Sequence, residues 1–172
     1  SGDICKLPEI VALAKKYGGV VVCLCLDENG IPETADGRIK VAKKIINTAA
    51  EYGIDKKDLI VDALAMTIST DTKNAIETLK AVDYIKHTLG VNTVLGVSNI
   101  SFGLPNREAV NTAFYTLCLK AGLSAGIINP KSQSMMNAYY SYNALAGLDE
   151  NCTEYIESAV VIDVVADASN IT

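Results

Sequence analysis

The sequence has no tryptophan, two phenylalanines, one histidine and an odd number of cysteines, five, without a CxxC pair. With so few large aromatic side chains there is little to stack on bases, and the net charge of −5 disfavours phosphate binding, so nucleic acid is not an expected partner. A lone histidine, His87, inside a helical pattern leaves a Cys/His zinc site too few ligands. We expect the cysteines to be buried, reduced thiols.

Long apolar runs and several catalytic motifs are missing as well. No run approaches the roughly 20 residues that span a bilayer, and the N-terminus lacks the layout of a signal peptide, so the cytoplasm is the expected location. There is no P-loop, no GxGxxG and no nucleophile–base pair, which disfavours NTPases, dinucleotide enzymes and hydrolases. The 172 residues, 49% of them apolar, suffice for an ordinary domain with a sizeable core.

Helical and strand-like segments alternate along the chain. Helical periodicity, often with a glycine directly after it, predicts helices over residues 6–17, 35–52, 71–89, from 107 onward and 132–146. Apolar runs bounded by turn residues predict buried strands over residues 19–27, from about 59, 93–97 and 124–129. This alternation is typical of an α/β fold with a parallel sheet. The segment AVVIDVVAD in the tail fits a short helix or a strand.

Each predicted strand meets a polar side chain near its carboxyl end: Asp27, Asp62, Asn99 and Asn129. A buried polar group costs a few kcal/mol unless it is paired or hydrated, so four such ends suggest one wet pocket at the carboxyl edge of the sheet.

Two readings remain open for each of these side chains. Asp62 fits either a bond to loop amides or the binding of a flat, guanidine-like edge by two parallel hydrogen bonds. Asn99, which follows Ser98, either caps its strand or bridges a ring nitrogen or a water. Arg107 lies on the surface or holds its loop over the pocket, and DENG around Asp27 has an ordinary turn composition.

LGVSNISFGLPNR, preceded by LIVDALAMT and followed by AGLSAGIINP, closely resembles the pterin-binding domain of cobalamin-dependent methionine synthases. It is similar to the methyltetrahydrofolate:corrinoid/iron-sulfur protein methyltransferases as well. The resemblance implies a dihydropteroate-synthase-like TIM barrel, a fold that typically needs about 250 residues. This chain would supply its C-terminal half, four βα units, over residues 1–155, with residues 156–172 as a tail or linker. The open edges of such a half imply self-association or a separate N-terminal half-barrel.

The family moves the N5 methyl group of methyltetrahydrofolate to a cobalamin or other corrinoid, which a partner domain or protein carries. The resemblance implies that Asn99 serves N5 and that Asp62 pairs with the amino-pyrimidine edge of the pterin. The other residues implied in substrate binding are Ser98, Phe102, Arg107, Ile127 and Asn129. No metal site and no membrane partner are expected.

Two alternatives accompany this hypothesis. Dihydropteroate synthase is less similar, because it would place a lysine on the strand at TVLGVSNIS and an Arg-x-His at SAGIINP. A half-barrel that only folds or assembles is the other, since the acidic and amide groups of the family's earlier strands are missing here. Phe102 stands where some corrinoid/iron-sulfur methyltransferases have glutamine, which favours the methionine-synthase branch.

Overall fold

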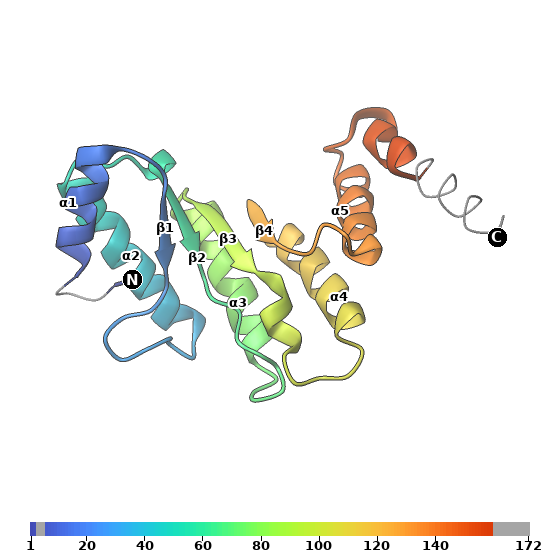
Figure 1. Cartoon of the computed structure of the whole chain (residues 1–172), viewed down its shortest axis with the longest axis horizontal. Helices are drawn as coiled ribbons and strands as arrows, with labels where there is room; N and C mark the ends of the chain where they lie inside the picture. Colours follow the sequence, from blue (N-terminus) through green and yellow to red (C-terminus); the bar gives the residue numbers. More distant parts are fainter. Residues whose placement is uncertain (3–5, 160–172) are drawn as a thin grey trace. The chain divides into compact units, whose positions relative to one another are not determined.

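A parallel sheet of four short strands organises the part of the chain that the structure, a computed structural model, describes: residues 1–2 and 6–159 (Figure 1). The strands are β1 (Val21–Leu24), β2 (Leu59–Asp62), β3 (Asn92–Gly96) and β4 (Ala125–Ile127). They lie in the order β1-β2-β3-β4, so each strand pairs with the next along the chain. The predicted α/β class with a parallel sheet is confirmed.

Local signals in the sequence explain where the helices begin and end. The helices are α1 (Leu7–Tyr17), α2 (Ala35–Glu51), α3 (Asn74–Asp83), α4 (Arg107–Lys120) and α5 (Gln133–Leu145). Pro8 lies in the first turn of α1, and Gly18 ends that helix with φ +78°, a conformation that glycine adopts at little cost. The Thr34 hydroxyl accepts a hydrogen bond from the Gly37 amide at the start of α2, and Ser132 caps α5 in the same way. Within the described ranges, no helix has both the length and the apolar character needed to cross a bilayer.

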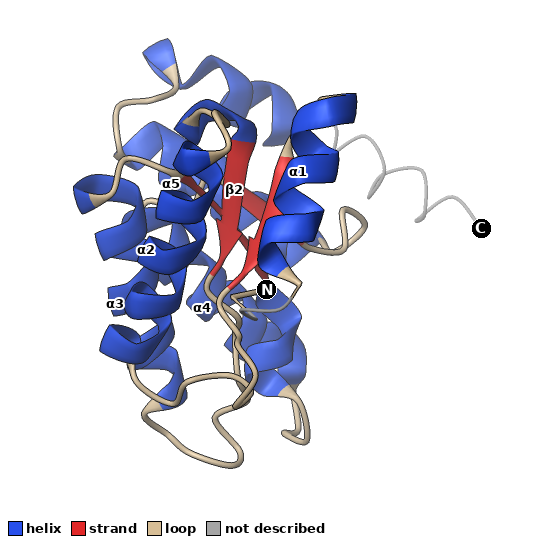
Figure 2. Cartoon of the chain, turned by 90° about the vertical axis from the view of Figure 1, so that its left-hand side faces the viewer, coloured by secondary structure: helices blue, strands red, loops and turns tan. Residues whose placement is uncertain are grey.

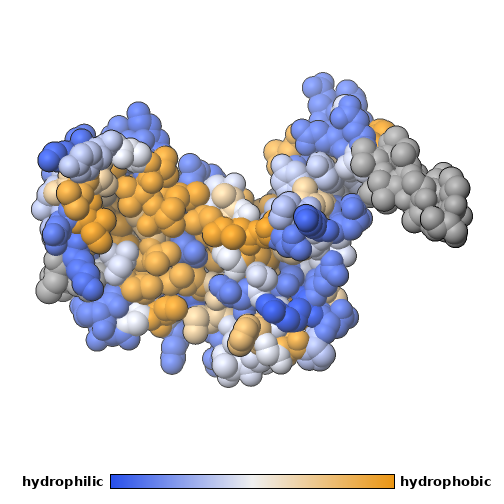
Figure 3. All heavy atoms as spheres, in the orientation of Figure 1, coloured by the Kyte–Doolittle hydropathy of each residue, from blue (hydrophilic) through white to orange (hydrophobic). Residues whose placement is uncertain are grey.

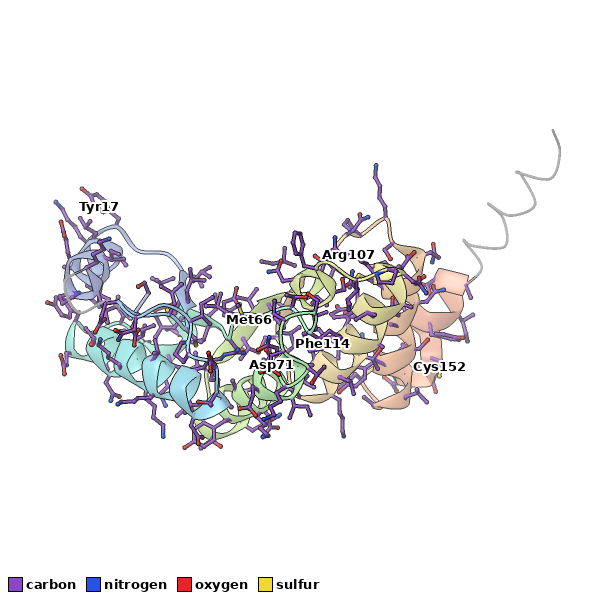
Figure 4. The ribbon with its side chains drawn as sticks, turned by 90° about the horizontal axis from the view of Figure 1, so that it is seen from below. Tyr17, Met66, Asp71, Arg107, Phe114 and Cys152 are labelled. Carbon is purple, nitrogen blue, oxygen red and sulfur yellow. The ribbon has the colours of Figure 1, made fainter. Side chains whose placement is uncertain are left out.

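The two faces of the sheet have different surroundings. Side chains at alternate strand positions, Cys23, Val61, Thr93 and Leu95, are buried on the face that α2, α3 and α4 cover (Figures 2 and 4). Burial of a valine or leucine contributes about 1.5–3 kcal/mol each, so this face is the core. On the opposite face Val22 and Ile127 are 57% and 63% exposed. Figure 3 shows apolar side chains gathered over the strands on that side.

The chain divides into two compact units, Ser1–Ile128 and Asn129–Thr172. The first holds the sheet with α1 to α4, and the second holds α5 and the residues after it. The predicted boundary at residue 155 stays a prediction. The AVVIDVVAD segment lies largely outside the described residues, so the choice between helix and strand there stays open.

Three local details differ from the sequence prediction. β3 ends at Gly96, and Val97–Ser101 forms a 3-10 turn, so Ser98 and Asn99 lie on this turn rather than on a strand. The helix expected from Asp71 begins at Asn74, because the Asp71 carboxylate accepts the Lys73 amide in a turn before the helix, and its last turn is π-helical over Tyr84–Thr88. Asparagine is a favoured capping residue, so the sequence predicts Asn106 as the cap of α4. It does precede α4, but in a left-handed conformation and without a capping bond from its side chain.

Candidate active site

Asp62 is the last residue of β2, at the carboxyl edge of the sheet. One carboxylate oxygen, Oδ1, accepts a hydrogen bond of 2.8 Å from the Leu64 amide. Burial raises the pKa of Asp62 above its ordinary value, and the bond from Leu64 opposes that rise. The side chain is half-buried, so its carboxylate keeps acceptor positions for a ligand.

Asn99 lies on the 3-10 turn after β3, with its amide folded back over that strand. Its Nδ2 would be 3.2 Å from a Cβ atom placed on Gly96, so the glycine leaves the room that the amide occupies. Asn99 is exposed, and its amide can donate as well as accept.

The strand register brings Asp62, Asn99 and Ile127 to one face of the sheet. Asp62 pairs with Val94, and Gly96 is two residues further along β3, so Asp62 and Gly96 point to the same side. Gly96 pairs in turn with Ile127, which is 63% exposed on that side. A carboxylate from β2, an amide from the turn after β3 and an apolar side chain from β4 thus lie on the open face; their joint role in a site stays a prediction.

Arg107 holds the 3-10 turn that carries Asn99. Its Nε donates to the Ser101 hydroxyl at 3.0 Å, and its Nη2 donates to the Ser98 carbonyl at 2.8 Å. The guanidinium also lies 5.7 Å from the ring centroid of Phe102, a cation–π contact. Arg107 therefore lies on the surface and also supports its loop; that it holds the loop over a pocket stays a prediction.

Phe102 and Ser98 lie on the outer rim of this loop. Phe102 is 67% exposed, and the Ser98 side chain is exposed as well. Ser101, between them in the chain, is fully buried beneath Arg107. Ser98 and Phe102 are thus presented on a loop that a partly buried hydrogen bond between Arg107 and Ser101 fixes.

The loop after β2 is joined to the loop after β3 by hydrogen bonds that the sequence analysis missed. The Ile68 amide donates to the Ile100 carbonyl at 2.9 Å. The hydroxyls of Thr67 and Ser69 donate to the Phe102 carbonyl at 2.7 and 2.8 Å. Figure 4 labels Met66 and Asp71 of the first loop and Arg107 at the start of α4. The polar run TISTDT was the only signal for these contacts in the sequence.

Arg38 is the second feature that the sequence analysis missed. It is fully buried on α2, although arginine is rarely found without exposure. Its position could have been found from spacing, because residue 38 is four before Ala42 and seven before Ile45, on the apolar stripe of the helix.

The other two strand-end side chains, Asp27 and Asn129, each bond to a nearby backbone amide. Asp27 forms an antiparallel bridge with Gly30, and its Oδ1 accepts the Asn29 amide at 2.9 Å, so it belongs to a turn. Asn129 opens the second unit, where its Oδ1 accepts the Lys131 amide at 3.1 Å. The role of Asn129 in a site stays a prediction.

The gathered groups suit a flat, polar heterocycle. A carboxylate accepts two parallel hydrogen bonds from an amidine-like edge, an amide contacts a ring nitrogen, and an aliphatic side chain packs on the ring face. Among the described residues, no group of three or more His, Cys, Asp or Glu side chains is placed to hold a metal ion.

Comparison with known proteins decides the family. The family model described as "Pterin binding enzyme" matches residues 3–129, most of the chain. The chain belongs to the pterin-binding enzyme family. Its open sheet face with Asp62 and Asn99 lies within the matched residues of this pterin-binding chain.

Individual relatives of the pterin-binding chain are named methionine synthase or methylcorrinoid:tetrahydrofolate methyltransferase. It is 33% identical over 144 residues to the methionine synthase of Mycobacterium tuberculosis, which covers 79% of this chain and 12% of that protein. The methionine synthase of Mycobacterium leprae is 33% identical over 156 residues, 86% of this chain and 13% of that protein. The methylcorrinoid:tetrahydrofolate methyltransferase of Eubacterium limosum is 29% identical over 136 residues, 78% of this chain and 50% of that protein. The chain thus spans from about an eighth to half the length of these relatives.

Proposed function

We propose that this chain is the pterin-binding part of a methyltransferase that takes the N5 methyl group from methyltetrahydrofolate and passes it to a corrinoid. The corrinoid, whose cobalt accepts the methyl group, would be carried by a partner domain or protein. The names of the relatives support this reaction class. The gathering of Asp62, Asn99 and Ile127 on one open face is the observation that carries the proposal.

Each of these groups has a separate task in the proposed site. Asp62 binds the amino-pyrimidine edge through two parallel hydrogen bonds, with the Leu64 amide holding the carboxylate in place. Asn99 hydrogen-bonds to N5, because a tertiary amine nitrogen leaves only when charge developing on it is stabilised. Ile127 packs on the ring, and Ser98 and Phe102 line the slot.

Arg107 orients the loop with Asn99 and does not itself need to reach the pterin. Asn129 is assigned to the same substrate-binding group because its amide follows the end of β4. The barrel part of the chain is proposed to extend to residue 155.

The exposed apolar face supports a half-barrel as the form of this part. The four strands, with α2, α3 and α4 on one side, leave Val22 and Ile127 more than half exposed on the other. A closed barrel fills its interior with side chains from about eight strands. We propose that four further βα units, from a preceding segment or a second copy, complete the pocket. Without those further units, this half-barrel would act only as a folding and assembly unit, which is the second candidate function.

Calorimetric titration with methyltetrahydrofolate tests the proposal, with Asp62→Asn as the variant. Asparagine keeps the shape but replaces one acceptor oxygen with a donor, so loss of a charged hydrogen bond of ~1.5–3 kcal/mol should weaken binding about 10- to 100-fold. Asp27→Asn is the matched control, because Asp27 also ends a strand but bonds within its own turn. Equal affinities of wild type and Asp62→Asn, or equal losses in both variants, would reject the assignment of Asp62.

A further inference from the structure

Leu64, two residues after Asp62, has a backbone conformation that leucine rarely adopts. Its φ is +62°, in the left-handed region, where a side chain with a Cβ crowds the carbonyl that follows it. This conformation matters because the Leu64 amide is the donor to Asp62 Oδ1. Something outside the Leu64 backbone must hold it there.

The Leu64 carbonyl accepts a hydrogen bond of 3.1 Å from Nη1 of Arg38. Arg38 is fully buried and also bonds to the Pro32 carbonyl through Nε and to the Thr78 hydroxyl through Nη1, at 2.9 and 2.7 Å. These bonds reach the loop before α2, the loop after β2 and α3, so the guanidinium is fixed from three directions. A planar guanidinium with several donors can serve three such acceptors at once.

Arg38 is also costly to the fold. It carries charge in the protein interior, and its Nη2 is buried without a hydrogen-bond partner among the described residues. Burial lowers the pKa of Arg38, the direction expected when the charged form is penalised. An apolar side chain at residue 38 would avoid this penalty, so the arginine has a role that packing alone does not explain.

We infer that Arg38 is a positioning residue for Asp62: it holds the Leu64 peptide in its left-handed conformation, and the Leu64 amide in turn fixes the carboxylate that would bind the pterin. The part of this inference that concerns pterin binding rests on the proposed function. The part that concerns the positions of Arg38, Leu64 and Asp62 does not. Asp62 and Arg38 are linked through one residue, Leu64, whose carbonyl accepts from Arg38 and whose amide donates to Asp62.

A direct charge effect of Arg38 on Asp62 is the competing explanation. Burial raises the pKa of Asp62 and the Leu64 bond lowers it. The bonds of Leu64 to both side chains favour action through this residue. Cys25 is a titratable group close to both, since Asp62 raises its pKa and Arg38 lowers it. Burial raises the pKa of Cys25 to about 12, so this thiol stays neutral while Asp62 titrates.

The test combines Arg38→Met with a second substitution that removes the strain. In Arg38→Met the Leu64 residue should relax and its amide should leave Asp62, so the pKa of Asp62, followed by carboxyl-carbon NMR, should rise above the wild-type value. The affinity for methyltetrahydrofolate should fall about tenfold, the change that ~1.4 kcal/mol produces. Adding Leu64→Gly should restore both, because glycine adopts positive φ without help.

Thr78→Val is the matched control, because it removes another partner of the same Nη1 and leaves the bond to Leu64. It should leave the pKa of Asp62 unchanged. If Arg38→Met does not fold, Arg38→Lys replaces it, since lysine keeps the charge but not the planar donor geometry.

Three results would overturn the inference: a wild-type pKa of Asp62 in the Arg38 variant that folds, no recovery on adding Leu64→Gly, or the same pKa change in Thr78→Val. The NMR titration needs no folate. A wild-type protein that binds no methyltetrahydrofolate would therefore count against the proposed function, while the titration still decides the role of Arg38.

Discussion

Arg107→Ala should loosen the turn that presents Asn99 and lower the free energy of unfolding by about 2 kcal/mol. The two hydrogen bonds to Ser101 and the Ser98 carbonyl contribute about 0.5–1.5 kcal/mol each, toward the lower end because Arg107 is exposed. The contact with the exposed Phe102 ring adds about 0.5 kcal/mol. Arg107→Lys should lose roughly half as much, because one ammonium cannot match both acceptors with the geometry of the guanidinium.

Urea denaturation measures these losses, and hydrogen exchange locates them. The amides of residues 97–101 should exchange faster in Arg107→Ala than in wild type, while the strand amides of β2 change little. Phe102→Leu isolates the ring contact and should cost much less than Arg107→Ala. The reasoning fails if Arg107→Ala destabilises by less than about 0.5 kcal/mol, or if Arg107→Lys matches wild type in both measurements.

Two further predictions follow from burial. Burial raises the pKa of Asp62, so Asp62 stays protonated to higher pH in the folded state than in the unfolded chain. The stability that protonated Asp62 contributes is fully present below the pKa of the unfolded chain, about 3.9. This stability is lost as the pH rises through the pKa of the folded state. Asp62→Asn should therefore be more stable than wild type at pH 7 and similar near pH ~3, and equal stability at both in thermal unfolding would contradict this. Burial also raises the pKa of Cys25 and Cys118 to about 12, so both stay thiols at neutral pH. Iodoacetamide should therefore label the exposed Cys152 but neither Cys25 nor Cys118, which mass spectrometry of a Cys5→Ser variant would show.

Local sequence patterns were sufficient for the elements and their order. Apolar runs bounded by turn residues marked the strands, and helical periodicity followed by glycine marked the helices. Thr34 and Ser132 each stand directly before a helix that they cap. The strand ends also placed Asp62 at the carboxyl edge of the sheet, where parallel strands all end. The face that Asp62 and Ile127 share follows only from the register of the strands in the structure.

Contacts between loops could not be predicted in this way. The turn at Val97–Ser101 looks like the end of a strand in the sequence, but Arg107 and the loop after β2 hold it in 3-10 form through partners up to 35 residues away. Arg38 was missed for a similar reason, since its acceptors at Pro32, Leu64 and Thr78 come together only in the fold. Periodicity reports which face a residue occupies, not which polar atoms meet it there.

A substitution at Gly96 would move the Asn99 side chain without changing its chemical identity. The amide occupies space that a methyl group at residue 96 would enter, at 3.2 Å, so alanine there would displace it by a few tenths of an ångström. The position of the Asn99 side chain thus depends on the absence of a Cβ atom at Gly96. A substitution at Asn99 would change the position and the chemistry of this group together. Alanine at residue 96 would change only the position of the Asn99 amide at the proposed methyl-transfer centre.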